Sequence, residues 1–472
     1  MVLVKQRLAD GSLKKYKARL VANGSKQHMH TYNNISSPTA RESSIKLFYA
    51  KAASLGRNIR TFNIKGAYLK SNMDTEMYML LPKQRATDPP QWVKLLKSIY
   101  GLRQAGKLWF ENIRAVLLEN KFNQCIQDEC IFSLFDADTN TDIDVVLFVD
   151  DFLTSSENDH SSNQLLNILR GKYGEVSETT PSETHLGIKW ETLPTGDIKI
   201  SQPGYIAKIL KTLNLESCTG EDLPFISEYN NSQDITSHTH TETATNELRT
   251  ILGLLNHAAI HTRPDIMFQT AFLATRVTNA TIHEIAQAMH VVYYLQRTKS
   301  LGLIFTSGVG FQLEAFIDSS RDLNSIDSKA HSGICFRLGS SKSASFHFIS
   351  KKQSLVTRSS NEAEIYAVDF GMHDIEYFRQ ILHFLRCPQS SPTIIYEDNE
   401  SSISMLSRKT KISTKSSHIF WRYNYALQAI DQGTAIMKWI STNEQIADIL
   451  WRGRGWIVEP RCRAIVLVSY SK

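Results

Sequence analysis

The feature that most restricts how this chain can fold is an apolar run that two adjacent carboxylates interrupt. Residues 145–153 read Val-Val-Leu-Phe-Val-Asp-Asp-Phe-Leu. Apolar residues on both sides of Asp150 and Asp151 predict two buried strands that meet at a hairpin tip. Charge at the edge of a core is costly unless a cation meets it. We therefore expect a cation at Asp150 and Asp151, with a solvated turn as the alternative.

A second set of acids lies far downstream, where strands and helices alternate from residue 310 onward. Each acid ends a predicted strand or lies on a predicted helix beside one, and the four are Asp318, Glu364, Asp398 and Asp448. The alternation predicts a separate α/β unit in which these acids converge on one edge. For the first helical acid, Glu362 is the alternative to Glu364.

Length and composition predict a folded protein with several cores. The chain has 472 residues, of which 42% are hydrophobic, and about 150 residues per domain suggests about three domains. The net charge of +6 fits a polyanionic partner without establishing one, and the basic stretch 5–26 is the part expected to meet phosphates. No apolar run approaches the ~20 residues of a membrane span. We expect an intracellular, soluble protein without a membrane partner.

Several segments, taken in order, resemble the reverse transcriptases of copia-type long-terminal-repeat retrotransposons. Upstream, the similar segments are residues 17–24, 64–69, 78–82, 100–105 and 149–151. Downstream, residues 349–353, 359–360, 397–399 and 447–450 resemble the ribonuclease H domain of the same family. The chain is thus identified as a fragment of a retrotransposon Pol polyprotein.

The resemblance implies that Asp150 and Asp151 bind two Mg²⁺ ions for nucleotidyl transfer. In the family a third Asp precedes the segment that begins at Ile64, whereas this chain has Asn63 there. A neutral amide weakens a cage for hard Mg²⁺ ions. We expect polymerisation to be slower by roughly 10² to 10⁴.

The resemblance also implies three nucleotide-binding residues. Arg19 matches the arginine that clamps the incoming triphosphate, with Lys14 or Lys15 as a second positive charge and a plain surface charge as the alternative. Tyr68 matches the aromatic residue that excludes ribonucleotides, with core packing as the alternative. Gln104 matches the residue that helps to position template and nucleotide.

The downstream acids match the Asp-Glu-Asp-Asp site of ribonuclease H, which binds two Mg²⁺ ions and hydrolyses the RNA strand of an RNA–DNA hybrid. The resemblance implies an RNA template, a DNA primer, dNTPs and the hybrid as partners, with self-association left open. It implies the cytoplasm, in a virus-like particle, with the nucleus as the other compartment. The alternative function is an inactive relic that binds nucleic acid without turnover.

The expected fold class is α+β and α/β multidomain. It comprises a right-hand polymerase with fingers, palm and thumb, a helical connection, and a ribonuclease H-like mixed sheet. The expected boundaries are 1–215 for the reverse transcriptase with part of the thumb, 216–247 for a polar linker, 248–309 for the thumb and connection, 310–452 for the ribonuclease H-like domain, and 453–472 for a degenerate tail that departs from the family pattern.

Overall fold

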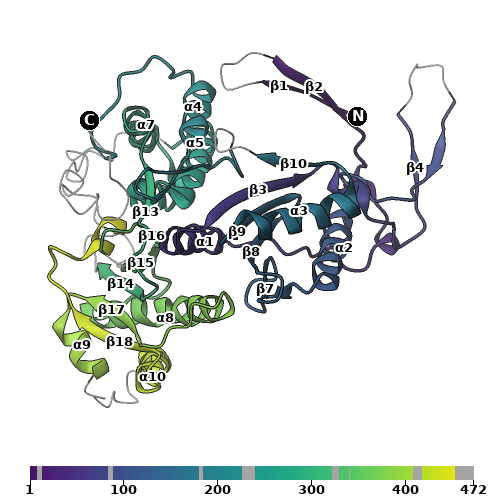
Figure 1. The fold of residues 1–472 in the computed structure, drawn as a ribbon. Helices are drawn as coiled ribbons and strands as arrows, with labels where there is room; N and C mark the ends of the chain where they lie inside the picture. The colour runs from purple at the N-terminus through teal and green to yellow at the C-terminus, as the bar shows by residue number, and fades with distance from the viewer. Residues whose placement is uncertain are drawn as a thin grey trace. The chain divides into compact units, whose positions relative to one another are not determined.

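The computed structural model in Figure 1 describes residues 1–7, 13–82, 89–179, 184–225, 240–320, 329–339, 341–407 and 417–451. Contacts divide the chain into two compact units. Unit 1 comprises Met1–Arg41 and Arg57–Thr180, and unit 2 comprises Glu42–Gly56 and Pro181–Lys472. Both units combine helices and strands, so the predicted mixed α/β multidomain class is confirmed.

Unit 1 is built on a six-stranded antiparallel sheet in the order β10-β3-β9-β8-β7-β6. The strands are β3 (Asn58–Ile64), β6 (Asn123–Gln124), β7 (Ile131–Asp136), β8 (Thr141–Phe148), β9 (Asp151–Ser156) and β10 (Val176–Thr179). The predicted hairpin around the two carboxylates is therefore confirmed, because β8 pairs with β9 through Phe148 and Asp151. Apolar side chains of the sheet, such as Phe62 and Phe152, are fully buried.

Helices and small hairpins complete unit 1. These elements are α2 (Ala105–Glu119), α3 (Asp159–Tyr173), the 3-10 helices η1 (Gly24–Lys26), η2 (Met29–Thr31) and η3 (Ala67–Lys70), and the hairpins of β1 (Val2–Arg7) with β2 (Leu13–Arg19) and of β4 (Tyr78–Leu80) with β5 (Trp92–Lys94). Helix α3 packs on β3, β8, β9 and β10. Its buried face follows a helical repeat through Leu165, Leu166 and Leu169, which explains why this segment is helical.

Unit 2 begins with a helix that lies early in the sequence. Helix α1 (Glu42–Leu55) contacts β12, β13, β15 and β16, and all of its residues from Ser43 to Ser54 are buried. Two lysines of this helix are buried. Lys46 donates to the Ile260 carbonyl at 2.6 Å, and Lys51 donates to the Leu385 carbonyl at 2.8 Å. Buried ammonium groups need such acceptors.

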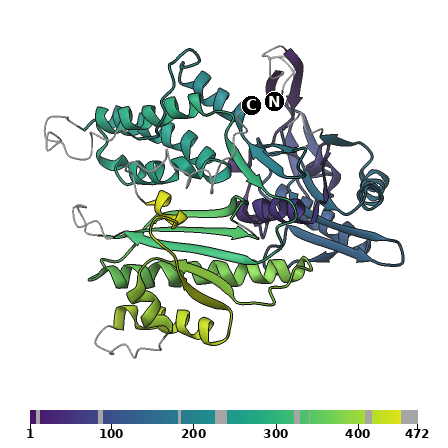
Figure 2. The ribbon, with the colours of Figure 1, turned by 60° about the vertical axis from the view of Figure 1, so that its left-hand side comes forward.

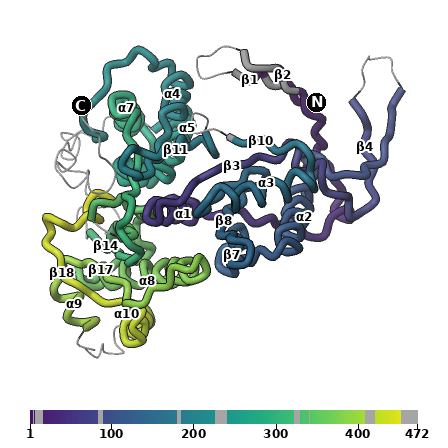
Figure 3. The backbone as a smooth tube through the Cα atoms, viewed as in Figure 1, coloured from purple at the N-terminus to yellow at the C-terminus, as the bar shows by residue number. Residues whose placement is uncertain are grey.

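A helical region follows in unit 2 (Figure 3), together with a small sheet. They comprise β11 (Lys189–Thr192), β12 (Ile198–Ser201), α4 (Pro203–Thr212), α5 (Glu242–His261), η6 (Pro264–Ile266), α6 (Met267–Ala274), η7 (Val277–Asn279), α7 (Ile282–Arg297) and β13 (Gly302–Phe305). Strands β11, β12 and β13 form an antiparallel sheet. A buried Arg263–Asp265 ion pair of 2.6 Å fixes the turn after α5.

The remaining part of unit 2 is a five-stranded mixed sheet with helices beside it (Figure 2). Its order is β16-β15-β14-β17-β18, with β14, β15 and β16 antiparallel and β17 and β18 parallel to β14. The elements are β14 (Leu313–Ser320), β15 (His331–Leu338), β16 (Ser345–Lys352), α8 (Ser360–Phe384), β17 (Thr393–Glu397), α9 (Glu400–Ser407), α10 (Ser417–Asp431), β18 (Ala435–Trp439) and η9 (Ile446–Leu450). The predicted mixed sheet is confirmed.

Parts of the sequence-based prediction fall on residues that the structure does not describe. The tail 453–472 and residues 226–239 of the polar linker lie outside the described ranges, as do the side chains of Lys14 and Lys15. Within the described part of the chain, no helix combines the length and apolar character needed to cross a membrane.

Candidate active sites

The tip of the β8–β9 hairpin holds the first pair of carboxylates. Strand β8 ends at Phe148 and β9 begins at Asp151, so Val149 and Asp150 form the turn. Val149 has a φ of +56°, a conformation that is strained for a β-branched residue. The Trp109 indole donates to the Val149 carbonyl, and Ile64 N–H donates to the Asp150 carbonyl at 3.0 Å. The surrounding structure therefore holds the turn in one shape.

Asn63 lies directly opposite Asp151 on the neighbouring strand. The register of β3 and β9 pairs these two residues, and the Asn63 amide Nδ2 donates to Asp151 Oδ1 at 2.8 Å. Burial raises the pKa of Asp151 to about 6; the Asn63 hydrogen bond lowers it and the Asp150 charge raises it. The amide thus gives Asp151 a proton donor where the family resemblance predicts a third anion.

Two aromatic rings lie near Asp150, and an arginine lies over one of them. The Tyr68 ring meets the Tyr100 ring edge-on at 4.9 Å, and the Arg19 guanidinium lies 5.0 Å from the centre of the Tyr100 ring. Burial raises the pKa of both tyrosines, and the Asp150 charge raises it further. Tyr68 also packs against a small apolar cluster, so the contacts fit core packing as well as the predicted role at the sugar.

Gln104 is fully buried and its amide is engaged inside unit 1. Its Nε2 donates to the Thr31 carbonyl at 3.0 Å, and its Oε1 accepts from Gln27 Nε2 at 2.7 Å. These two bonds hold the 24–31 segment against the start of α2. The contacts give Gln104 a structural role, and its role in positioning nucleotide remains a prediction.

The second constellation begins with Asp318, near the end of β14. Asp318 is 3% exposed, and its Oδ2 accepts from the Trp451 indole at 2.7 Å while its Oδ1 accepts from Ser319 N–H at 2.8 Å. Burial raises its pKa well above the usual range, and a hydrogen bond with Asp448 raises it further. Asp448 is itself buried in η9, so the structure brings these two acids together.

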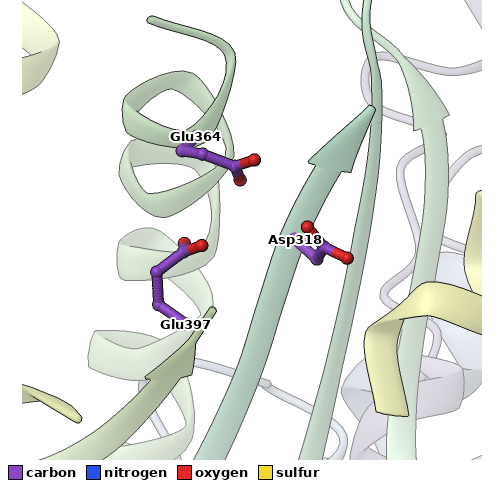
Figure 4. A group of neighbouring side chains, drawn as sticks. All are labelled: Asp318, Glu364 and Glu397. Carbon is purple, nitrogen blue, oxygen red and sulfur yellow. The ribbon is translucent and has the colours of Figure 1, made fainter. Parts of the chain in front are cut away.

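Glu364 faces Asp318 from helix α8, and Glu397 joins them from the end of β17. Each of these three acids has a ligand oxygen within 4.8 Å of the others. Figure 4 shows Glu364 pointing from its helix towards Asp318, with Glu397 pointing into the same space. Burial raises the pKa of Glu364, the Glu397 and Asp318 charges raise it further, and burial raises the pKa of Glu397 to about 8.

The other two acids near this site face different partners. Asp398 is half-buried, and its Oδ2 accepts from the Thr442 hydroxyl at 2.7 Å. It does not belong to the three-acid group, although its charge contributes to raising the pKa of Asp318. Glu362, the alternative to Glu364, accepts from the Arg358 N–H at 2.6 Å at the start of α8.

Gln445 holds the two strands that carry the acids, and the sequence reasoning gave it no role. Its buried Nε2 donates to the Ile317 carbonyl at 3.0 Å and to the Tyr396 carbonyl at 3.2 Å. These carbonyls belong to β14 and β17, one residue before Asp318 and Glu397 respectively. The full burial of Gln445 marks it as a structural residue. The sequence does not reveal this burial, because the two strands that Gln445 contacts come from distant parts of the chain.

The two constellations differ in how well they fit a divalent cation. Glu364 Oε2 and Glu397 Oε2 are buried with no hydrogen-bond partner, and an oxygen-rich anionic site of this kind suits Mg²⁺. Across the described ranges, Asp318, Glu364 and Glu397 are the one group of three such side chains with this spacing. In unit 1, by contrast, an amide proton already occupies one oxygen of Asp151, so the residues present do not form a three-carboxylate cage.

Comparison with known proteins gives a family match for the first part of the chain and relatives for most of its length. Residues 3–227 match the family described as reverse transcriptase (RNA-dependent DNA polymerase). The chain is 28% identical over 453 residues to the Pol polyprotein from transposon RE2 of Arabidopsis thaliana, covering 95% of this chain and 30% of the relative. It is 26% identical over 448 residues to the Pol polyprotein from transposon TNT 1-94 of Nicotiana tabacum, and this match covers 93% of this chain and 33% of the relative. It thus spans about a third of these relatives.

Among solved structures, an N-terminal ribonuclease H domain from Mycobacterium tuberculosis is similar over 30% of this chain and 91% of that chain, with 15% identity and a TM-score of 0.24. The sequence matches define the class: this chain has a reverse transcriptase region, and by family it is an enzyme. More specifically, the chain is similar over most of its length to the Pol polyproteins of plant retrotransposons, in agreement with the resemblance seen in its sequence.

Proposed function

We propose that unit 2 carries a Mg²⁺-dependent ribonuclease H that hydrolyses the RNA strand of an RNA–DNA hybrid. The observation that carries this proposal is the buried meeting of Asp318 and Glu364, whose Oε2 has no hydrogen-bond partner. Asp448 supports it through its hydrogen bond with Asp318. Asp398 belongs to the proposed set because it lies at the same edge, held by Thr442.

The residues of this site divide the work of hydrolysis. When bound, a pair of Mg²⁺ ions would activate a water molecule and stabilise the departing oxygen. Asp318, Glu364, Asp398 and Asp448 would hold these ions, and Gln445 keeps β14 and β17 at the spacing that brings their acids together. The hybrid would be recognised through its backbone and 2′-hydroxyl groups rather than its bases.

The nuclease proposal is tested with a hybrid whose RNA strand is labelled. We expect Mg²⁺-dependent cleavage by the full chain, and a loss of about a hundredfold or more in the Asp318→Asn and Asp398→Ala variants. Glu400→Gln removes an exposed carboxylate near β17 and is the matched control, which should cleave normally. If the unaltered chain cleaves the hybrid no faster than the Asp398→Ala variant does, the proposal is wrong.

For unit 1 we propose an RNA-directed DNA polymerase that is impaired at Asn63. Asp150 and Asp151 would bind the metal, Arg19 and Tyr68 would contact the incoming dNTP, and the substrates would be an RNA template with a DNA primer. The support is the grouping of Arg19, Tyr68 and Asp150 around Tyr100. The Asn63–Asp151 bond supports impairment. DNA synthesis by the unaltered chain at rates typical of the family would contradict it.

A second candidate function is nucleic-acid binding without turnover. It is favoured by the donors that occupy metal-ligand oxygens, namely the Asn63 amide at Asp151 and the Trp451 indole at Asp318. Under this alternative, the chain would bind the hybrid in the presence of Mg²⁺ but release no product in either assay. The retrotransposon relatives support an intracellular place of action for both candidates, and self-association is tested by sedimentation.

A further inference from the structure

The last residue of β17, Glu397, is an acid that the Asp-Glu-Asp-Asp pattern does not include. In this strand Thr393, Ile395 and Glu397 are buried, whereas Ile394 and Tyr396 are partly exposed. Successive side chains of a strand point to opposite faces, so Glu397 continues the inward face. Asp398, the next residue, is turned to Thr442 instead.

The two oxygens of Glu397 have different surroundings. Oε1 accepts from the Asn399 N–H at 3.1 Å, which fixes the carboxylate at the strand end. Oε2 is buried and has no hydrogen-bond partner, and Figure 4 shows the carboxylate directed into the space between Asp318 and Glu364. A buried carboxylate oxygen without a donor is costly to maintain.

Nothing in the described protein neutralises this group of acids. Within the ranges that the structure describes, none of the three forms an ion pair with a basic side chain. Three carboxylates within 4.8 Å repel one another strongly when they are ionised in a buried site. The arrangement needs either protons or a cation.

We propose that Glu397 is a further metal ligand of the nuclease site, contributing Oε2 beside Asp318 and Glu364. This inference rests on the proposed ribonuclease H function. Glu397 adds an anionic oxygen from the end of β17. The residue that follows it, Asp398, accepts a hydrogen bond from the Thr442 hydroxyl instead. The site therefore binds divalent ions more tightly than one in which β17 supplies Asp398 alone.

The test uses Mn²⁺ binding to the full chain without nucleic acid, followed by the electron paramagnetic resonance of free Mn²⁺, together with thermal melting. Glu397→Gln keeps an acceptor for the Asn399 N–H and removes the charge. We expect its metal-free melting temperature to rise at neutral pH, because a neutral amide avoids the cost of burying an acid beside two others, and its Mn²⁺ affinity to fall about tenfold or more. The matched control Glu400→Gln removes an exposed charge three residues away and should bind Mn²⁺ within twofold of the parent chain.

The outcomes separate this inference from the function on which it rests. If Glu364→Gln weakens Mn²⁺ binding and Glu397→Gln does not, Glu397 is not a ligand and the nuclease proposal stands. If Asp318→Asn, Glu364→Gln and Glu397→Gln all leave binding unchanged, both proposals are wrong. Should Glu397→Gln fail to fold, Glu397→Asp decides: it keeps the charge but withdraws it by one methylene. An affinity reduced at least threefold supports the ligand role, and an unchanged affinity overturns it.

Discussion

Replacing Asn63 by Asp is the sharpest test of the polymerase site, because one hydrogen bond is exchanged for one charge. In the present chain, Asn63 Nδ2 donates to Asp151 Oδ1 at 2.8 Å. The substitution removes that donor and sets a carboxylate beside Asp151. Two unit charges about 4 Å apart repel by about 4 kcal/mol at an effective dielectric constant of about 20. The variant should therefore be less stable than the parent chain when metal is absent.

The same repulsion becomes a driving force for metal binding. A cation that relieves about 4 kcal/mol gains about three decades in affinity, at about 1.4 kcal/mol per decade. We expect the variant's melting temperature to rise steeply with Mg²⁺, and primer extension on an RNA template to speed up by roughly 10² to 10⁴. The stability loss should diminish as the pH falls, because the pKa of Asp151 is about 6 in the parent chain and both the lost hydrogen bond and the added charge raise it further in the variant.

Asn58→Asp is the matched control for this experiment. It makes the same chemical change at the other end of β3, where Asn58 is exposed and its amide lies 3.4 Å from Asp159. This control should gain neither Mg²⁺-dependent stability nor primer extension. The reasoning is refuted if Asn63→Asp binds Mg²⁺ no more tightly than the control. Tighter binding without primer extension would instead locate a further defect elsewhere.

Three other predictions concern unit 2. Trp451→Phe removes the indole donor from Asp318, so we expect Mn²⁺ to bind several-fold more tightly; equal or weaker binding would show that the indole does not compete with the ion. Gly333→Ala should lower the free energy of unfolding by about 1–3 kcal/mol, because a Cβ would lie 2.5 Å from the Ala447 carbonyl; urea unfolding measures this, and an unchanged midpoint contradicts it. The pKa of Glu397 is raised to about 8, so the folded metal-free chain holds a proton that the unfolded chain loses near pH 4.5. Its contribution to stability is present below about pH 4.5 and is lost as the pH rises to about 8, and Glu397→Gln should flatten this dependence in urea unfolding with a chelator.

Local sequence patterns were sufficient to predict the β8–β9 hairpin. The apolar residues on both sides of Asp150 and Asp151 specify strands of the right length, and only a short turn fits between them. The position of Asn63 opposite Asp151, by contrast, could not be predicted from local sequence patterns. It depends on the register between β3 and β9, which pairs residues 88 apart in sequence. The resemblance to a family supplied that pairing; periodicity alone did not.

The place of helix α1 could not be predicted from sequence. Apolar residues of this segment, such as Ile45, Phe48 and Ala52, recur at helical spacing, and the structure has a helix at Glu42–Leu55. However, residues on every side of this helix are buried, and its partners β12, β13, β15 and β16 all come from beyond residue 197. Which distant surfaces cover a helix that is buried on every side is a question of long-range packing. A boundary drawn along the sequence therefore cannot assign this helix to a unit.

Glu397 shows how a resemblance can direct attention away from a signal that strand geometry contains. The family pattern selected Asp398, but alternation along β17 places Glu397 on the buried face with Ile395. The same physical criterion then separates the two sites of this chain. At Asp151 the Asn63 amide donates the hydrogen bond that an ionised carboxylate needs, so Oδ1 has a partner without a metal ion. At Glu364 and Glu397 the free oxygens face one another, and only protons or a cation can satisfy them. We therefore expect divalent ions to stabilise mainly unit 2. In unit 1 we expect strong stabilisation by divalent ions only after the Asn63 amide donor has been removed.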